Sequence, residues 1–389
     1  IGESQQMRLL YDTTLIQKQI IEIPINKRSD VRFNWYQKNK SNLVQVIPED
    51  CPRMIKQESK LEVPRCRLPK PAIYILEITG NLEQFGLGFV RGASGADALI
   101  EVLSFGNLNL KSLSGAFSRA SNLKRVPNTL PRTVTDLSNL FHHAKKFNQD
   151  LSNWDVSRVK SFSGMFSHAE AFNQPLNSWD MRNAKYIIGM FDGAKAFNQP
   201  LDQWDTRSVT SIKRVFEDTP SFDQNLSNWR LPNVRDMSRA FYRAQSFNNG
   251  SKPLDWSSAT KVEDISSLFK DTKAFNQPIK LPTHNVTDTS GAFENATAFN
   301  QPLSDWDMRN VRRMSNMFSG AVSFNQDISN WELSSVEYMR DFSKNSGLSG
   351  ENKPQTTLWR DISIMFSKIW EWVTDILKYI LMMIAYLFS

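Results

Sequence analysis

Acidic residues recur along the middle of the sequence at a spacing that could form a binding surface. They occupy one position of a repeated segment, and that column reads Asp155, Asp180, Asp205, Arg230, Ser257, Pro282, Asp307 and Glu332. Carboxylates stacked at the distance between neighbouring strands, about 5 Å, repel one another unless a cation or a basic partner compensates. The column predicts either a recognition stripe for a basic or hydroxyl-rich partner, or aspartates that each accept hydrogen bonds from backbone N–H groups at a local turn.

Residues suited to catalysis are sparse. The chain has four histidines, and none lies in a His-Glu-x-x-His arrangement. There is no Cys-x-x-Cys pair and no Gly-x-Ser-x-Gly segment, so the usual zinc and serine-hydrolase patterns are absent from the sequence. His168 fits best as a solvent-facing residue of a helix. We expect no catalytic residues, no metal and no cofactor.

The element that carries the acidic column is a repeat. Its second phenylalanine recurs every 24 or 25 residues, with a single interval of 28, at Phe117, Phe141, Phe166, Phe191, Phe216, Phe241, Phe269, Phe293, Phe318 and Phe342. A fixed period of this length is typical of solenoids, in which each unit buries its apolar face by stacking on its neighbours. The tryptophans and phenylalanines of successive units should therefore form one continuous hydrophobic column.

One unit shows which secondary structure to expect. Apolar residues at Val159, Phe162, Met165, Phe166 and Ala169 have the spacing of a short amphipathic helix. The position before the valine carries Asn or Ser in most sister units, as an N-cap does. The preceding segment 154–156 alternates as a very short strand would, with its aspartate facing outward. Strand plus helix in about 25 residues is the leucine-rich-repeat plan.

Two further features belong to the repeats. An asparagine follows the first phenylalanine of most units, and we interpret this column as a hydrogen-bonded ladder of Asn148, Asn173, Asn198, Asn248, Asn276, Asn300 and Asn325, with Asp223 as the substitute. One unit is longer than the others. Its extra residues predict a bend or a protruding loop, which is either a contact site or simple drift, at Asn249, Gly250, Ser251 and Lys252.

The repeat pattern Met-Phe-x-x-Ala-x-x-Phe-Asn-Gln-Pro-Leu-x-x-Trp-Asp, found at 165–180 and 190–205, resembles that of the BspA-like leucine-rich-repeat surface proteins of bacteria. The resemblance covers roughly residues 80–343. It implies a secreted or surface-displayed protein involved in attachment and in binding a host or partner. That family has no common catalytic motif, so the resemblance assigns no catalytic residue.

The segment before the repeats, residues 1–105, contains short alternating apolar runs and predicts an antiparallel β-sandwich that caps the first repeat. Its only cysteines, Cys51 and Cys66, are expected to form a disulfide in an exported protein. The chain carries a net charge of +7, with much of the excess in residues 1–70. A basic face could meet an anionic surface, although an ordinary solvated surface explains the charge as well. We expect no nucleic-acid partner.

After the repeats (106–345) and a polar linker (346–357), residues 358–389 predict a hydrophobic helix. Its proposed anchoring residues are Ile369, Trp370, Val373, Leu377, Ile380, Leu381, Ile384 and Leu387. A lone membrane span needs about 20 mostly apolar residues, but charged residues interrupt the first half of this helix. We therefore expect it to enter a membrane or a helical assembly with its polar half against partner helices.

Taken together, the sequence predicts an α+β protein: a leucine-rich-repeat-like solenoid with an N-terminal β-sandwich-like cap and a C-terminal helix. It begins at Ile1 without a recognisable signal peptide, as expected for a processed form of an exported protein. The expected function is non-enzymatic binding of a protein or glycan receptor at a cell or virion surface. The order of the parts also resembles the adsorption proteins at the tip of filamentous bacteriophages, whose last helices pack among coat-protein helices, several copies together. A structural spacer is the third alternative.

Overall fold

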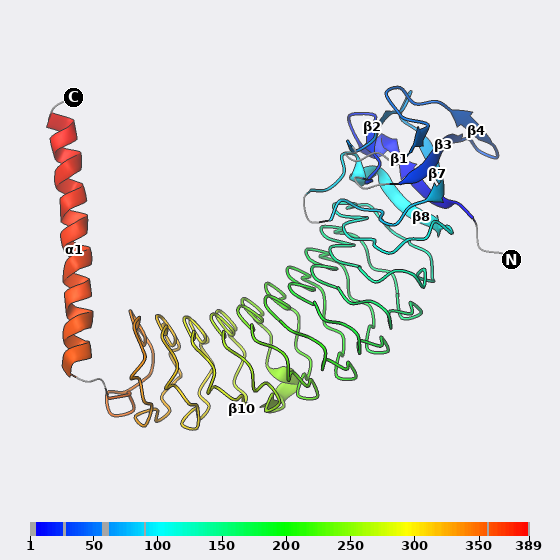
Figure 1. Ribbon diagram of the computed structural model, residues 1–389. Coiled ribbons are helices and arrows are strands. Elements are labelled where there is room, and N and C mark those ends of the chain that lie inside the picture. Colours follow the sequence, from blue (N-terminus) through cyan, green and yellow to red (C-terminus); the bar gives the residue numbers. More distant parts are fainter. Residues whose placement is uncertain (1–4, 26–28, 57–61, 89–90, 356–357, 388–389) are drawn as a thin grey trace.

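The computed structural model describes residues 5–25, 29–56, 62–88, 91–355 and 358–387. Figure 1 shows three parts in chain order: a β-rich N-terminal domain, a curved array of repeated coils, and one C-terminal helix. Within the described residues the chain is mostly β-bridges and turns, with that single α-helix.

The N-terminal domain is built on one antiparallel sheet of six strands. Strands β1 (Met7–Asp12), β3 (Asp30–Lys38), β4 (Leu43–Val46), β7 (Ile73–Asn81) and β8 (Leu99–Phe105) lie in the order β4-β3-β7-β1-β8, and β5 (Met54–Ile55) also pairs with β3. Alternate residues face the core, as Met7, Leu9 and Tyr11 do on β1. The strands expected from the sequence are present. The sandwich is not, because the other sheet has only two strands, β2 (Ile20–Glu22) and β6 (Arg65–Arg67).

Two short 3-10 turns, η1 (Thr13–Leu15) and η2 (Ala96–Ala98), connect parts of this domain. Cys51 and Cys66 are joined by a disulfide with an S–S distance of 2.05 Å. The bond ties the loop between β4 and β5 to strand β6, so it holds that loop beside the edge of the large sheet.

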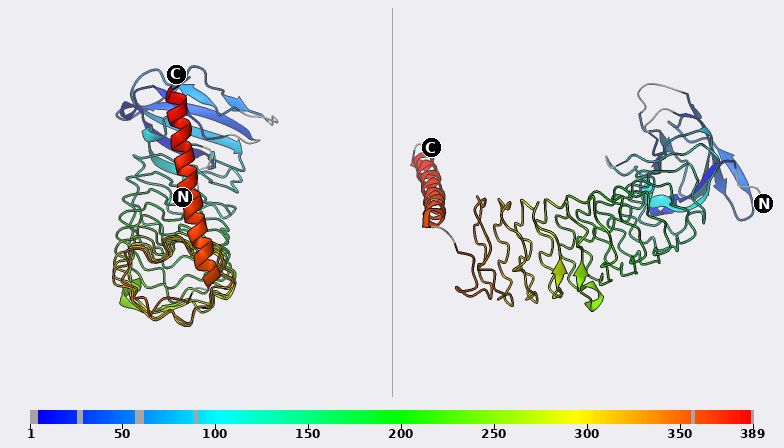
Figure 2. Two further views of the ribbon diagram at one scale, coloured as in Figure 1. Left: turned by 90° about the vertical axis from the view of Figure 1, so that its left-hand side faces the viewer. Right: turned by 60° about the horizontal axis from the view of Figure 1, so that its bottom comes forward.

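The repeats stack in register. Equivalent residues of successive coils form single parallel β-bridges, in a continuous series through Ser112, Asp136, Ser161, Tyr186, Ser211, Asp236, Asp264, Asp288, Arg313 and Tyr338. Figure 2 shows the coils following one another along a gently curved path. Because each coil bonds to the coils before and after it, the repeats form one structural unit.

The helix expected within each repeat is absent, and this prediction was wrong. Residues 163–168 are consecutive turns, with left-handed backbone at Gly164 (φ 63°) and His168 (φ 55°). The N–H of Phe166 donates to the carbonyl of Met190 in the next coil at 2.9 Å, whereas the N–H of Met165 donates to Phe162 at 3.0 Å. A left-handed residue at every fourth position interrupts an α-helix, and alternate N–H groups are used between coils. The apolar residues of the pattern are nevertheless buried.

The expected tryptophan strand is also absent. Segment 154–156 has no strand pairing, and the Trp154 N–H closes a turn onto the carbonyl of Leu151 at 2.9 Å. The bridge between coils lies further along the unit, at Ser161. A bridge of one residue leaves no alternating pattern, so the sequence could not place it.

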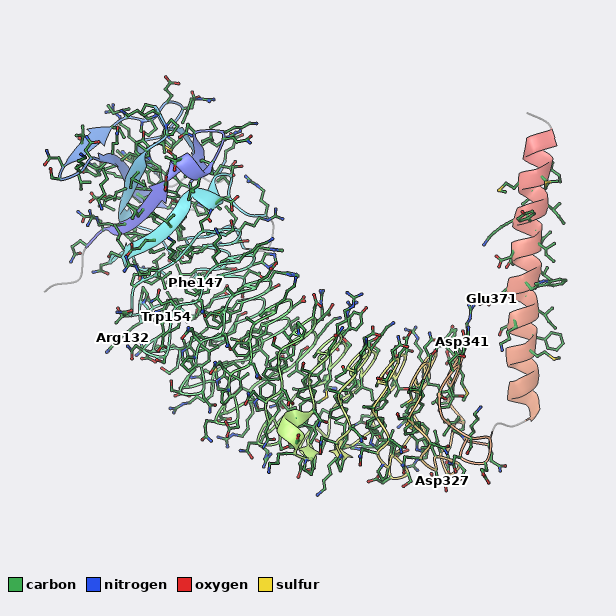
Figure 3. The ribbon with its side chains drawn as sticks, turned by 180° about the vertical axis from the view of Figure 1, so that it is seen from behind. Arg132, Phe147, Trp154, Asp327, Asp341 and Glu371 are labelled. Atoms are coloured by element: carbon green, nitrogen blue, oxygen red, sulfur yellow. A yellow bond between two sulfur atoms is a disulfide. The ribbon has the colours of Figure 1, made fainter. Side chains whose placement is uncertain are left out.

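The hydrophobic column runs through the whole array. Ring centroids of Phe141 and Phe166 lie 5.7 Å apart, those of Phe166 and Phe191 also 5.7 Å, and those of Phe191 and Phe216 5.6 Å. A second column formed by the first phenylalanines runs beside it. Figure 3 marks one of its members, Phe147, together with Trp154 in the array interior. Offset aromatic stacking of this kind adds to the stabilisation from burial alone.

The long unit keeps the column intact. It contains η3 (Asn249–Ser251) and strand β9 (Leu254–Asp255), which pairs in parallel with β10 (Ile279–Lys280) of the next coil. Phe241 and Phe269 still stack at 5.5 Å despite their 28-residue separation. The final element is helix α1 (Leu358–Leu387), which lies at the opposite end of the array from the N-terminal domain (Figure 1).

Candidate functional site

The predicted acidic stripe is a row of Asx turns neutralised by arginine. Asp180 accepts the backbone N–H of Arg182 at 3.2 Å and the Nε–H of the same arginine at 2.8 Å. Hydrogen bonds from the arginine side chain, with help from the backbone N–H, hold the pKa of Asp180 below its ordinary value. The same arrangement recurs at Asp205 with Arg207.

The remaining members of the stripe are either carboxylates in similar turns or a residue of opposite charge. Asp307 pairs with Arg309 at 2.9 Å, and Asp155 accepts the hydroxyl and N–H of Ser157 at 2.6 and 3.1 Å. Arg230 donates to the carbonyl of Ser227 at 3.0 Å. Glu332 ends the row. The stripe is therefore a mixed-charge surface, and the local turn alternative describes its aspartates.

This surface lies on the convex side of the array. Arg132, which belongs to the same row as Arg182 and Arg207, is on the outer side in Figure 3. A shallow hollow of about 550 Å³ occurs there between two coils, lined by Asp180, Arg182, Asn183, Asp205, Arg207 and Ser208. It offers paired charges and amides rather than an uncompensated acidic groove.

The asparagine column forms a ladder. Oδ1 of Asn173 accepts the backbone N–H of Asn198 at 2.9 Å and the side-chain amide of Gln199 at 3.1 Å. Asp223 continues the series by accepting the N–H of Asn248 at 2.8 Å, and the last step reaches Ser349. Each side chain is used in joining one coil to the next, so the ladder is structural.

The irregular loop is internally bonded. Asn249 is buried, and its Oδ1 accepts the N–H of Leu226 at 2.7 Å while its Nδ2 donates to the carbonyl of Lys252 at 2.9 Å. Gly250 has φ 59° and donates its N–H to Asp223 at 2.9 Å. Ser251 and Lys252 are exposed. The extra residues thus make a surface turn whose interior is filled by the Asn249 side chain. Only the side chains of Ser251 and Lys252 are available to a partner.

The structure brings together a set of side chains that the sequence did not single out. We call it the concave ridge, because Asp341 in the corresponding turn of the last coil lies on the concave side in Figure 3. The ridge consists of Arg119, His142, His143, His168, Asp192, Arg214, Glu217, Arg239, Tyr242, Arg243 and Lys270.

Three histidines lie together at one end of the concave ridge. The rings of His143 and His168 stack with centroids 4.5 Å apart, and those of His142 and His143 meet edge to face at 4.3 Å. Burial, together with the positive charges of its neighbours, lowers the pKa of His142 to about 4. His142 is therefore neutral near pH 7, and burial also lowers the pKa of His143.

Buried carboxylates occupy the middle of the ridge. Glu217 receives the Nε–H groups of Arg214 and Arg239, each at 2.9 Å. Asp192 pairs with Arg214 at 2.9 Å, yet burial and the nearby charge of Glu217 raise its pKa to about 6. Next to them, the guanidinium groups of Arg239 and Arg243 lie 4.7 and 4.9 Å from the Tyr242 ring.

The ridge residues share no pattern that predicts the ridge, and the helix on which His168 was expected to face solvent does not form. Only the run of polar and charged residues after each second phenylalanine signals it. In the part of the chain that the structure describes, no group of three or more His, Cys, Asp or Glu is arranged to hold a metal ion.

Comparison with protein families identifies the repeats. A family described as "Mycoplasma protein of unknown function, DUF285" matches residues 111–207, 187–279 and 253–359. The chain belongs to this family. The three overlapping matches cover the stacked coils and agree with the BspA-like resemblance at the level of a repeat protein. No curated protein matches the chain.

Helix α1 lies almost wholly outside the DUF285 repeats, and its apolar side chains are exposed. Among the proposed anchoring residues, exposed fractions reach 70% at Trp370 and 65% at Leu381. Ile369, Leu377, Ile380 and Ile384 are also exposed, Val373 is half-buried, and the side chain of Leu387 lies outside the described residues. Among the described residues, we find no helix with the length and apolar character needed to cross a bilayer.

Proposed function

We propose that this DUF285 protein is a non-enzymatic receptor-binding or adhesion protein, displayed outside the cell or on a virion and held there by α1. The observation that carries the proposal is the exposed apolar surface of α1 at one end of the array, with a folded β-rich domain at the other (Figure 1). Water-exposed apolar surface of this extent is typical of a segment that binds a membrane or another protein.

The character of α1 supports an attachment role. Trp370, Trp372 and Leu381 are each at least 65% exposed. Lys368, Glu371, Asp375 and Lys378 interrupt the first half of the helix, whereas residues 379–389 carry no charge. A helix of this kind is stabilised when its uncharged half is buried among lipid or other helices and its charges face polar groups.

For the array itself, we infer a BspA-like solenoid related to leucine-rich repeats, with turns in place of the usual helix. The series of parallel bridges and the aromatic column support this interpretation. Repeat arrays contact only their neighbours along the stack and present long surfaces suited to binding large partners. A protein or glycan receptor is the class of partner we propose.

The proposal is tested by removing residues 358–389 and comparing the variant with the full chain in fractionated producing cells or virions. We expect the full chain in the membrane or particle fraction and the variant in the soluble fraction, both with the same receptor-cell binding. Equal distribution of the two proteins would contradict attachment through α1. If this variant and a variant lacking residues 1–105 both still bind receptor cells, the array is the part that binds.

The convex stripe can be tested in the same assay. Charge reversal of Asp180 and Asp205 to lysine should leave the fold intact, because both pairs are at the surface. Unchanged receptor binding by this variant would eliminate the stripe as the recognition surface.

A second candidate is an adsorption protein, that is a minor coat protein, of a filamentous bacteriophage. It is favoured by the uneven charge of α1, which suits a helix packed among other helices with several copies together. Purified virions containing the chain, with copies cross-linked to one another through residues 358–389, would support this alternative. A pure spacer would show neither receptor binding nor loss of binding on truncation.

A further inference from the structure

The N-terminal sheet ends in an exposed strand. β4 pairs with β3 and with no other strand in the described part of the chain. Leu43 is 45% and Val44 50% exposed on this strand, and Ile47 just beyond it is 65% exposed. An uncovered edge that carries apolar side chains is a template for pairing with another strand, and most proteins protect such edges.

The register shows which main-chain groups of β4 face outward. The N–H of Phe33 donates to Arg53 in the loop entering β5, and the N–H of Asn39 donates to Asn42 across the hairpin turn at 2.9 Å. Odd-numbered residues of β3 therefore direct their backbone N–H and C=O groups toward β4. Since Val44 pairs with Gln37 and Gln45 with Tyr36, Val44 bonds inward and Gln45 directs its N–H and C=O outward.

A cavity adjoins this edge. It has a volume of about 470 Å³ and lies along the middle of β3, between the residues that pair with β4 and those that pair with β5, against the loop held by the Cys51–Cys66 disulfide. Apolar lining comes from Phe33, Val46 and Met54 among others. Trp35 also lines it, and the buried Nε1 of that indole has no hydrogen-bond partner in the described residues. The apolar part of this lining can accept an apolar side chain.

The cavity is positively charged. Arg32 and Arg53 line it, both are exposed, and among the described residues neither has a carboxylate within 4.0 Å. The nearest acidic residues along the loop, Glu49 and Asp50, lie 4.0 Å from Arg67 instead. Of the residues that the structure describes, no acidic side chain lines the cavity itself. Charge complementarity therefore favours an anionic occupant.

We propose that the β4 edge and the adjoining cavity form a docking site for an extended, acidic segment of a partner protein, which adds to the sheet as a further strand. Outward main-chain groups of β4 would bond its backbone, the cavity would receive an apolar side chain, and Arg32 and Arg53 would pair with its carboxylates. This inference deepens the proposed receptor-binding function, on which it rests, by naming the surface and the partner chemistry.

Two other occupants fit less well. A glycan has no repeating N–H and C=O groups with which to satisfy a strand edge. A second copy of this chain would bring two β4 edges together, and with them two cavities that are each lined by the exposed Arg32 and Arg53. Positive charge would then face positive charge, which disfavours this pairing.

The test uses the full chain and a fluorescein-labelled ten-residue peptide in which valine alternates with threonine and glutamate. Fluorescence polarisation should show saturable binding. Gln45→Pro removes the outward N–H while sparing the bonds between β3 and β4, because proline is tolerated on edge strands. We expect it to weaken binding at least tenfold. Gln45→Ala, which keeps the N–H, should bind as the original chain does.

Charge specificity is tested separately with surface substitutions that do not touch the strand backbone. Arg32→Glu combined with Arg53→Glu should weaken binding of the glutamate peptide at least tenfold. The same variant should gain affinity for a peptide with lysine in place of glutamate. This swap tests the proposal even where the proline variant fails to fold.

Three outcomes would overturn the proposal. The first is the absence of saturable binding up to millimolar peptide. The second is equal peptide binding by the Gln45→Pro and Gln45→Ala chains. The third is self-association of the unliganded chain that Gln45→Pro abolishes, because a second copy would then be the occupant. Attachment through α1 is measured by fractionation and is independent of peptide binding. Failure of the docking site is therefore distinguishable from failure of the proposed function.

Discussion

The tryptophans of the array allow the value of one buried hydrogen bond to be measured by comparing two equivalent positions. Trp204 is 2% exposed, and its Nε1 donates to the carbonyl of Leu176 in the preceding coil at 2.9 Å. Trp306 is 5% exposed and stacks on Phe293 much as Trp204 stacks on Phe191, yet its Nε1 has no partner in the described residues.

The difference occurs next to the long unit. In the other coils the acceptor is the carbonyl four residues after the first phenylalanine, as Leu303 follows Phe299, so the equivalent acceptor for Trp306 is the carbonyl of Ile279. Ile279 lies in β10, which pairs with β9 of the preceding coil through the N–H of Leu254 on Pro278 and that of Trp256 on Lys280, each at 2.8 Å. The missing tryptophan hydrogen bond therefore coincides with the strand pair that the irregular unit introduces.

We expect Trp204→Phe to destabilise the protein more than Trp306→Phe does. Both substitutions remove the same ring atoms from the column, so the lost packing is closely matched. Only Trp204→Phe leaves a buried carbonyl without its donor, which costs about 1–3 kcal/mol. The difference in unfolding free energy should lie in that range.

Urea denaturation followed by far-UV circular dichroism measures this difference, provided that the two variants share the same m-value. Phe191→Ala serves as a reference for a large packing loss, about 3–5 kcal/mol. Equal losses for the two tryptophan variants, or a larger loss for Trp306→Phe, would refute the assignment of stability to the interior tryptophan hydrogen bonds.

Three other predictions follow from the contacts described. Asn198→Ala removes the acceptor of the Asp223 N–H, 2.9 Å away, and should lower stability by about 1–2 kcal/mol in urea denaturation, whereas Asn198→Asp keeps an acceptor oxygen and should be tolerated. Asp180→Asn breaks an exposed pair and should change stability by less than about 1 kcal/mol, so a larger loss would show that the convex stripe is structural. The folded-state pKa of Asp192 is about 6 against an ordinary 3.8, so this group favours the folded state below about pH 4 and loses that contribution as pH rises through 6. The Asp192→Asn variant lacks this contribution, so its unfolding free energy relative to that of the original chain should fall by up to about 3 kcal/mol between pH 7 and pH 4. Urea denaturation at each pH measures this difference, and the same pH profile for both chains would contradict the prediction.

The sequence was sufficient to predict features that depend on residue type at a fixed period. The aromatic column and the asparagine ladder are of this kind, because each unit supplies the same group at the same place, as Phe166 and Asn173 do in one coil. The C-terminal helix was predictable from its long periodic run. The repeat nature of the chain is confirmed by the family match.

Conformation within the unit was harder to predict. Apolar residues at Phe162, Met165, Phe166 and Ala169 fit a helix and also fit a series of turns that buries the same four side chains. The deciding positions are the two left-handed residues, which are Gly164 and His168 in one unit but Arg214 and Asp218 in another. With no consistent glycine, the sequence carried no clear signal against a helix.

The stripe illustrates what local sequence can and cannot reveal. An arginine follows two residues after Asp180, Asp205 and Asp307, and this spacing was visible in the sequence as a means of neutralising each carboxylate. The concave ridge was not visible in the same way, because Glu217 meets Arg239 only through the stacking of adjacent coils.

The mode of stacking also explains how the array can hold the β-rich domain and helix α1 apart. Every coil donates N–H groups forward to the next coil, as Phe166 does to Met190, and the ladder bonds its opposite side, as Asn173 does to Asn198. A coil cannot slide relative to its neighbour without breaking both sets of bonds and the aromatic contacts between them. Bending is therefore distributed over many coils, and the long unit is absorbed without a break in the column. An array built in this way holds its first coil, and the β-rich domain that precedes this coil and joins it through β8, at a set distance from its last coil.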